Sequence, residues 1–100
     1  IDKFLEHTRL YMFCNDKNPK VYISSADWMT RNIENRVEVS CPIYDEDIKQ
    51  ELIDTFNICW NDNVKSRILD KKQTNTYFRN ENEKIRAQFD TYSYYKNKLN

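Results

Sequence analysis

The 100-residue sequence contains no glycine, although average usage would place about seven in a chain of this length. Glycine-rich phosphate loops depend on close backbone approaches that only glycine permits. A P-loop and a GxGxxG dinucleotide fingerprint are therefore both excluded within these residues. Turns that need a positive φ must use other residues, and the abundant asparagine is the first choice.

Cysteine is scarce, odd in number and widely spaced, at Cys14, Cys41 and Cys59, with no CxxC motif. This pattern argues against a disulfide scaffold and favours a reducing cytosol. The same three cysteines with His7, the only histidine, would make a Cys3His zinc set, but the paired ligand spacing of such sites is missing. We therefore expect the cysteines to be buried as small apolar side chains.

Charge of either sign is not in excess, because 16 basic residues balance 16 acidic ones. A chain-wide field that would attract nucleic acid or anionic lipid is therefore not indicated. No apolar run approaches the ~18–20 residues that span a bilayer, and no signal-peptide pattern opens the chain. Since the first residue is Ile1 rather than methionine, we expect a piece of a longer protein. The length suits a single domain over residues 1–100.

Alternation of apolar and polar residues predicts three strands in the first half of the chain, at residues 8–14, 20–25 and 35–41. The turn-forming "NDKNP" at 15–19 should join the first two as a hairpin. Residues 26–33 suit a short helix or turn whose Trp28 and Met29 enter the core. Pro42 should end the third strand.

The second half of the chain has helical spacing. A helix is predicted over residues 45–68, with Asp45 as N-cap and a break available at 61–63, where weak helix formers cluster. A short strand at 74–79 and a helix at 83–96, which "YSYY" (92–95) should help to pack, complete the chain. The order β-β-short α-β-α-β-α indicates an α/β (α+β layered) fold, a mixed sheet packed by helices.

One polar strand face carries candidate chemistry. His7 and Arg9 are two residues apart on the first strand, as are Arg36 and Glu38 on the third, so each pair shares a face. If these strands pair, the face presents a histidine, two arginines and a carboxylate. Guanidinium groups bind phosphate through two oxygens, and a carboxylate beside a histidine fixes its tautomer. A solvated face with salt bridges explains the pattern equally well.

Five segments in order resemble the C-terminal end of polyphosphate kinases: "FLEHTRLYMF", "VYISSADWMTRN", "RVEVSCPIYD", "IKQELIDTFN" and "DNVKSRILD". The resemblance covers nearly the whole chain. It implies a phospholipase D-like half, and a fragment of the second C-terminal domain of such an enzyme. It also implies reversible transfer of the terminal phosphate of ATP to inorganic polyphosphate, through a phosphohistidine that lies outside this segment.

The resemblance assigns roles to residues at matching positions. His7 corresponds to a second active-site histidine, and Arg36 to an arginine that lines the phosphate site. Arg9 and Arg31 are expected to bind further phosphate oxygens, and the strand end at Ser25 and Asp27 to face His7. We infer that Glu38 is the carboxylate that orients His7.

The resemblance also implies ligands and partners. Magnesium is needed, with its ligands largely outside this segment, and ATP is the substrate. The expected partners are ATP or ADP, inorganic polyphosphate, the remaining domains of the same chain and further copies in a homo-oligomer, but not nucleic acid. The expected location is the cytoplasm, with peripheral attachment to the membrane left open, and the isolated segment should be inactive.

Two other functions remain open. A phospholipase D-like phosphodiesterase half would need an intact HxK-x4-D motif, but Arg9 stands at the lysine position and Cys14 at the aspartate position. A purely structural or oligomerisation segment would leave catalysis to other parts of the protein. The basic "RILDKK" at 67–72 is most simply a solvated run, although its bases could extend a polyanion track.

Overall fold

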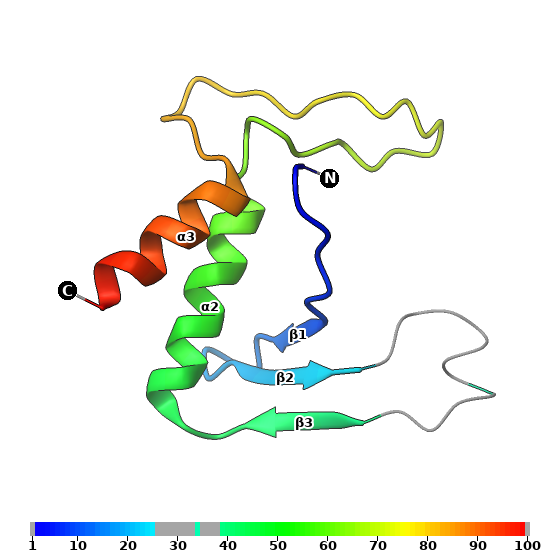
Figure 1. The fold of residues 1–100 in the computed structure, drawn as a ribbon. Helices are drawn as coiled ribbons and strands as arrows, with labels where there is room; N and C mark the ends of the chain where they lie inside the picture. The colour runs from blue at the N-terminus through cyan, green and yellow to red at the C-terminus, as the bar shows by residue number, and fades with distance from the viewer. Residues whose placement is uncertain (1, 26–33, 35–38, 100) are drawn as a thin grey trace. The chain divides into compact units, whose positions relative to one another are not determined.

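The computed structural model describes residues 2–25, 34 and 39–99 (Figure 1). The described elements follow the order β1 (Leu10–Phe13), β2 (Lys20–Ser24), β3 (Ser40–Ile43), α2 (Glu46–Trp60) and α3 (Ala87–Lys98). Two compact units divide the chain, one formed by Glu6–Ile53 and one by Ile1–Leu5 with Asp54–Asn100. The expected α/β class is confirmed.

The three strands form one antiparallel sheet with β2 in the centre. Tyr22 lies opposite both Tyr11 and Pro42, and the next rung joins Met12, Val21 and Ile43 on the other face. The predicted hairpin of β1 and β2 is confirmed. Its turn has positive φ at Asn15 (43°), Asp16 (55°) and Lys17 (66°), so asparagine shares with an aspartate and a lysine the positions that glycine often takes.

Pro42 does not end the third strand, as the sequence had predicted. It lies inside β3, opposite Tyr22, because β3 is an edge strand and an edge position tolerates a residue without an N–H. β3 also runs to Ile43, beyond the predicted end at residue 41. The predicted short helix at 26–33, with Trp28 and Met29, and the first part of the predicted strand at 35–38 lie outside the described residues.

α2 begins as predicted, but it ends at Trp60 and not at residue 68, so the predicted helix stops at the break that the sequence allowed at 61–63. The backbone N–H groups of Asp47 and Ile48 donate to Asp45 Oδ1 at 2.9 and 3.0 Å, which confirms Asp45 as the N-cap. Past Trp60 the N–H groups of Val64, Lys65 and Ser66 donate to Asp62 Oδ1 at 2.9, 2.7 and 3.0 Å. In a continued helix these N–H groups would donate to backbone carbonyl oxygens. Here the Asp62 carboxylate accepts them instead, so the helix does not continue.

α3 begins at Ala87 rather than at residue 83 because Asn63 forms hydrogen bonds with the backbone just before the helix. The N–H of Asn63 donates to Ile85 O at 3.1 Å, and the N–H of Ile85 donates to Asn63 Oδ1 at 2.8 Å. The N–H of Ala87 then donates to Asp62 Oδ2 at 2.8 Å. Side chains from the end of α2 thereby set the start of α3.

The predicted strand at 74–79 is reduced to one antiparallel bridge, between Arg67 and Tyr77. In the tyrosine-rich segment 92–95, which was predicted to help pack the last helix, Tyr94 makes the contact with α2. Its hydroxyl donates to Asp54 Oδ2 at 2.7 Å. This hydrogen bond is the main cause of the raised pKa of Tyr94. It joins α3 to the second half of α2 within one unit.

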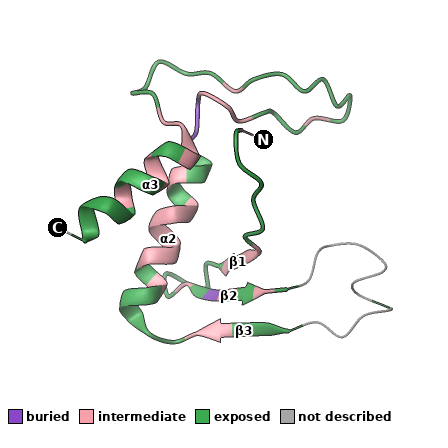
Figure 2. Ribbon diagram, viewed as in Figure 1, coloured by how far each residue is buried: buried purple, intermediate pink, exposed green. Residues whose placement is uncertain are grey.

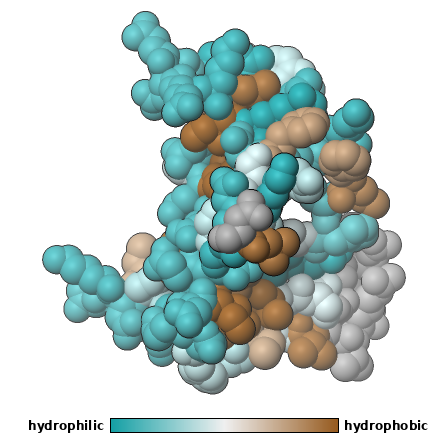
Figure 3. Space-filling view, turned by 60° about the vertical axis from the view of Figure 1, so that its left-hand side comes forward, coloured by the Kyte–Doolittle hydropathy of each residue, from teal (hydrophilic) through white to brown (hydrophobic). Residues whose placement is uncertain are grey.

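Few of the described residues are buried (Figure 2). Among the residues that the structure describes, Val21 is the one apolar side chain classed as buried, and Asp62 and Asn63 are the buried polar ones. Trp60 and Leu69 are 74% and 97% exposed. Hydrophobic side chains accordingly appear on the surface in Figure 3. No helix within the described ranges is both long and apolar enough to cross a membrane.

The prediction that the cysteines are buried is wrong, because Cys14, Cys41 and Cys59 are all exposed, and none of them forms a disulfide. Cys14 directly follows β1 at the start of the turn, and Cys41 is on the edge strand β3. Cys59 is in the last turn of α2.

Candidate functional site

Polar groups meet at one end of the sheet, where β1 begins, β2 ends and β3 begins. The N–H of Ser24, the last residue of β2, donates to Arg9 O at 3.0 Å. The hydroxyl of Ser40, the first residue of β3, donates to Ser24 Oγ at 3.0 Å. Arg9, directly before β1, and Ser24 and Ser40 therefore follow one another across the end of the sheet, and we call them the Arg9–Ser24–Ser40 rung.

Ser25 extends the pairing of β2 and β3 by one step. Its N–H donates to Val39 O at 2.9 Å, and the N–H of Val39 donates to Ser25 Oγ at 3.0 Å. The serine hydroxyl thus stands in for a backbone acceptor at the edge of the ladder. Ser25 thereby continues the pairing with the β3 side of the sheet one residue beyond the end of β2.

His7 and Arg9 are close, though not through strand alternation. β1 begins only at Leu10, so both residues precede it. Arg9 Nη1 donates to the backbone oxygen of His7 at 3.0 Å, which holds the guanidinium against the chain that carries the imidazole. The His7 side chain is exposed, and Arg9 is half-buried.

The other predicted site residues lie outside the described residues: Asp27, Arg31, Arg36 and Glu38. Ser24 and Ser40 were not singled out as site residues from the sequence. A signal for Ser40 was present, because it continues the alternation that puts Arg36 and Glu38 on one face of the predicted strand.

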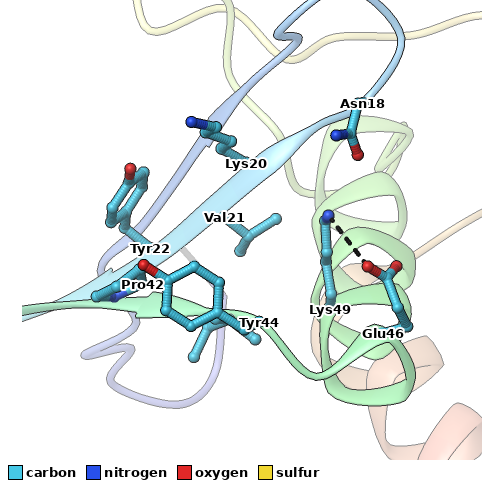
Figure 4. Close-up of a pocket in the computed structure, with 9 residues that line it drawn as sticks. Asn18, Lys20, Val21, Tyr22, Pro42, Tyr44, Glu46 and Lys49 are labelled. Carbon is cyan, nitrogen blue, oxygen red and sulfur yellow. Dashed lines mark ion pairs between the residues drawn. The ribbon is translucent and has the colours of Figure 1, made fainter.

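A cavity of about 230 Å³ lies at the opposite end of the sheet, beside the first turn of α2 (Figure 4). Lys49 Nζ, on a side chain that is 12% exposed, lies 3.7 Å from Glu46 Oε1 at its margin. The cavity is smaller than a usual small-molecule pocket. None of the predicted site residues lines it: its walls are Asn18, Lys20, Val21, Tyr22, Pro42, Ile43, Tyr44, Glu46 and Lys49.

Metal-binding chemistry has no donor set within the described chain. No group of three or more histidine, cysteine, aspartate or glutamate side chains there could hold a metal ion. The Cys3His set considered from the sequence is therefore not assembled. Magnesium, which favours several oxygen ligands around one ion, likewise finds no prepared cluster of carboxylates among these residues.

Among the residues with described positions, the most enclosed charged side chain is that of Asp62, which is 4% exposed. Burial alone raises the pKa of its carboxyl group, but the backbone N–H groups of Ala87, Lys65, Val64 and Ser66 bind the ionised form and leave the pKa below its ordinary value. From the sequence, this residue had been considered only as part of a helix break. An aspartate that precedes turn-forming residues commonly binds backbone amides just ahead, which was the available signal.

These features define the class of protein. It is a layered α/β domain with an arginine and two serines at one end of a small sheet. The family model "Polyphosphate kinase C-terminal domain 2" matches residues 1–88. The polyphosphate kinases of Vibrio parahaemolyticus and Vibrio cholerae are 50% and 52% identical to this chain over 98 residues. Those alignments cover 97% of this chain and 14% of each relative.

A solved structure agrees. The crystal structure of polyphosphate kinase from Porphyromonas gingivalis matches with a TM-score of 0.94 and 41% identity, covering 98% of this chain and 15% of that one. The chain therefore belongs to the polyphosphate kinase family, in the part described as C-terminal domain 2. It spans about one seventh of the length of the curated relatives.

Proposed function

We propose that this chain is part of an enzyme that reversibly transfers the terminal phosphate of ATP to inorganic polyphosphate. The observation that carries the proposal is the family match over residues 1–88, together with a polyphosphate kinase structure of the same fold. Because the chain covers only 14% of its relatives, the nucleophilic histidine and most of the nucleotide site would belong to the rest of the full-length enzyme.

The end of the sheet supports a phosphate-binding role. The Arg9–Ser24–Ser40 rung consists of an arginine directly before β1, the last residue of β2 and the first residue of β3, and it supplies one guanidinium and two hydroxyl groups. These groups donate hydrogen bonds, and the arginine adds a positive charge, as phosphate oxygens require. The bond from Arg9 to the His7 backbone keeps this cation next to the residue that we assign to catalysis.

The transfer has two steps. The bond between the terminal phosphorus and the ADP oxygen breaks, its electron pair stays on ADP, and a bond forms to the nucleophilic histidine. That phosphorus–nitrogen bond then breaks as an oxygen at the end of polyphosphate bonds to phosphorus. Such reactions depend mainly on positioning and charge stabilisation.

Within this scheme the residues have separate roles. His7 donates a hydrogen bond or a proton to the leaving or entering phosphate, and Glu38 holds its tautomer. Arg36, with Arg9 and Arg31, neutralises phosphate oxygens, while Ser25 and Asp27 shape the strand end. The described residues do not fit a magnesium site, so no step is assigned to that ion here.

Exposed apolar side chains support the expected partners. Leu5, Trp60, Leu69 and Leu99 are 84%, 74%, 97% and 88% exposed. An apolar side chain left in water is costly, and contact with another protein surface removes that cost. We assign these four side chains to contacts with the remaining domains of the same chain and, in a homo-oligomer, with a second copy.

The test uses the full-length enzyme carrying His7→Ala and labelled ATP, with phosphoenzyme and polyphosphate followed together. We expect polyphosphate synthesis to fall by about 100-fold or more, because acid–base and charge-stabilising groups contribute on that scale. Thr8→Ala, at the neighbouring exposed position, is the matched control and should leave synthesis unchanged. A thermal melt of each variant establishes folding, and full synthesis by folded His7→Ala enzyme would refute the role of His7.

A further inference from the structure

The segment of residues 64–79 carries an unusual concentration of positive charge for a chain whose net charge is zero. It holds one acid, Asp70, and five bases, Lys65, Arg67, Lys71, Lys72 and Arg79. The segment folds back on itself through the Arg67–Tyr77 bridge, with Ile68 N donating to Thr76 O at 2.8 Å and Phe78 N donating to Ser66 O at 2.9 Å. We call residues 64–79 the basic loop.

Two arginines of the basic loop contact the same aromatic ring. The Cζ atoms of Arg67 and Arg79 lie 3.3 and 4.4 Å from the centroid of the Tyr77 ring. Backbone oxygens fix both guanidinium groups. Arg67 Nη1 donates to Asn75 O at 2.8 Å, and Arg79 Nη1 donates to the oxygens of Asn63, Val64 and Phe78 at 3.1, 2.9 and 2.9 Å.

The acid of the basic loop does not neutralise these arginines. Asp70 instead receives the N–H of Thr74 at 3.0 Å on Oδ1 and its hydroxyl at 2.6 Å on Oδ2. These bonds close a turn in which Gln73 and Asn75 have positive φ. Within the described chain neither arginine forms an ion pair, so two like charges are held close together without a carboxylate between them.

Guanidinium groups that are held in place and have no carboxylate in an ion pair can bind an anion. Their planar forks match phosphate oxygens, and their contacts with Tyr77 and the backbone reduce the side-chain entropy that binding would otherwise cost. We propose that Arg67 and Arg79 of the basic loop bind successive phosphate groups of a polyphosphate chain. This inference rests on the proposed function, because that function supplies polyphosphate as the ligand.

The geometry favours polyphosphate over nucleic acid as the polyanion. A single-stranded nucleic acid site combines cations with aromatic rings on which bases stack. Here the ring of Tyr77, the one tyrosine of the basic loop, already contacts two guanidinium groups, and these contacts compete with the stacking of a base on that ring. Polyphosphate has no bases and requires only the cations.

The experiment measures equilibrium binding of labelled polyphosphate to the full-length enzyme at constant ionic strength. Arg67→Gln removes one charge and the contact with Tyr77. Lys71→Gln removes the same charge from the same loop and is the matched control. We expect Arg67→Gln to weaken binding by about ten- to hundredfold, the scale of one charge-assisted contact, and Lys71→Gln by less than about twofold.

Two further variants separate the arrangement from the charge. Arg67→Lys keeps the charge but loses the planar fork, so its binding should be weaker than that of the unaltered enzyme. Tyr77→Leu removes the shared ring and should weaken binding without any change in charge. Equal binding by Arg67→Gln and Lys71→Gln, in variants with unchanged melting temperature, would overturn the proposal.

The remaining outcomes distinguish this inference from the function on which it rests. Failure of the unaltered full-length enzyme to bind polyphosphate would refute the proposed function itself. Normal polyphosphate synthesis and binding that are insensitive to Arg67→Gln would refute only the role of the basic loop. Competition by single-stranded RNA at the same phosphate concentration, lost in Arg67→Gln, would overturn the choice of polyphosphate as the ligand.

Discussion

Asp2 and Arg86, which are 84 positions apart in the sequence, form an ion pair through two parallel hydrogen bonds. Arg86 Nε donates to Asp2 Oδ2 and Nη2 donates to Oδ1, both at 2.7 Å. The same region is joined by Gln88, whose Oε1 accepts the N–H groups of Lys3 and Phe4 at 3.0 and 2.9 Å. The N-terminal residues are thereby attached to the start of α3.

Asp2→Asn should lower the melting temperature of this chain, because an amide cannot accept both guanidinium donors. The hydrogen bond from Arg86 is the main cause of the lowered pKa of Asp2. A lowered pKa in the folded state adds stability above the ordinary value of 3.8, and this stability is lost as the pH falls below it. Thermal melts at neutral pH and in acid measure the effect.

Glu83→Gln, a change of the same charge at an exposed position, is the control for Asp2. It should leave the melting temperature close to that of the unaltered chain. The expected difference between Asp2→Asn and the unaltered chain is largest at neutral pH and shrinks in acid. An equal melting temperature for Asp2→Asn and the unaltered chain at neutral pH would contradict a stabilising role for the pair.

Asp62→Asn should be among the most destabilising single changes in this chain. Its carboxylate accepts four backbone N–H groups, three after α2 and one at the start of α3. An amide nitrogen cannot accept, so at least one buried donor loses its partner. We expect a loss of about 2–4 kcal/mol in the free energy of unfolding, measured by urea titration, against an Asp47→Asn control.

The same aspartate predicts how stability depends on pH. Burial raises the pKa of Asp62, and the four N–H donors lower it further than burial raises it. Because the folded-state pKa is the lower one, the stabilisation is complete above the ordinary value of 3.8 and disappears as the pH falls through the folded-state value. The acid limb of an unfolding profile should be shallower in Asp62→Asn, and parallel profiles would exclude this contribution.

Asp45→Ala tests the start of α2. The Asp45 carboxylate accepts the N–H groups of Asp47 and Ile48, and its removal leaves both without that acceptor. We expect a loss of about 1 kcal/mol in the free energy of unfolding, the usual cost of an N-cap. Asp47→Ala, in the same first turn, removes a charge but no cap and should cost less. The reverse order of the two variants would contradict the assignment.

Local chemistry in the sequence was sufficient for several elements. Alternation located β1 and β2, and "NDKNP" located the turn between them. Asp45 was identified as the N-cap from its position before an apolar helical pattern, and the break after Trp60 from the run of weak helix formers at 61–63. Each of these depends on residues within a few positions of one another.

Other features depended on distant neighbours. The predicted start of α3 is wrong because the backbone N–H of Ile85 donates a hydrogen bond to Asn63, which lies about twenty positions earlier in the sequence. The prediction that Pro42 ends a strand is wrong because the tolerance of an edge strand for proline depends on the strand order, which the local sequence does not contain. To predict the Arg9–Ser24–Ser40 rung from the sequence would likewise have required the register between β2 and β3.

By itself the sequence determined the α/β class and the resemblance to polyphosphate kinases, and it supplied the candidate site residues, since propensity, periodicity and motif order are local properties. Only the tertiary structure decided that Asp62 and Asn63 form a polar centre, that Asp2 pairs with Arg86, and that Arg67 and Arg79 share Tyr77. A hydrogen bond or a ring contact depends on which distant groups meet within a few ångströms, and no local pattern encodes that distance.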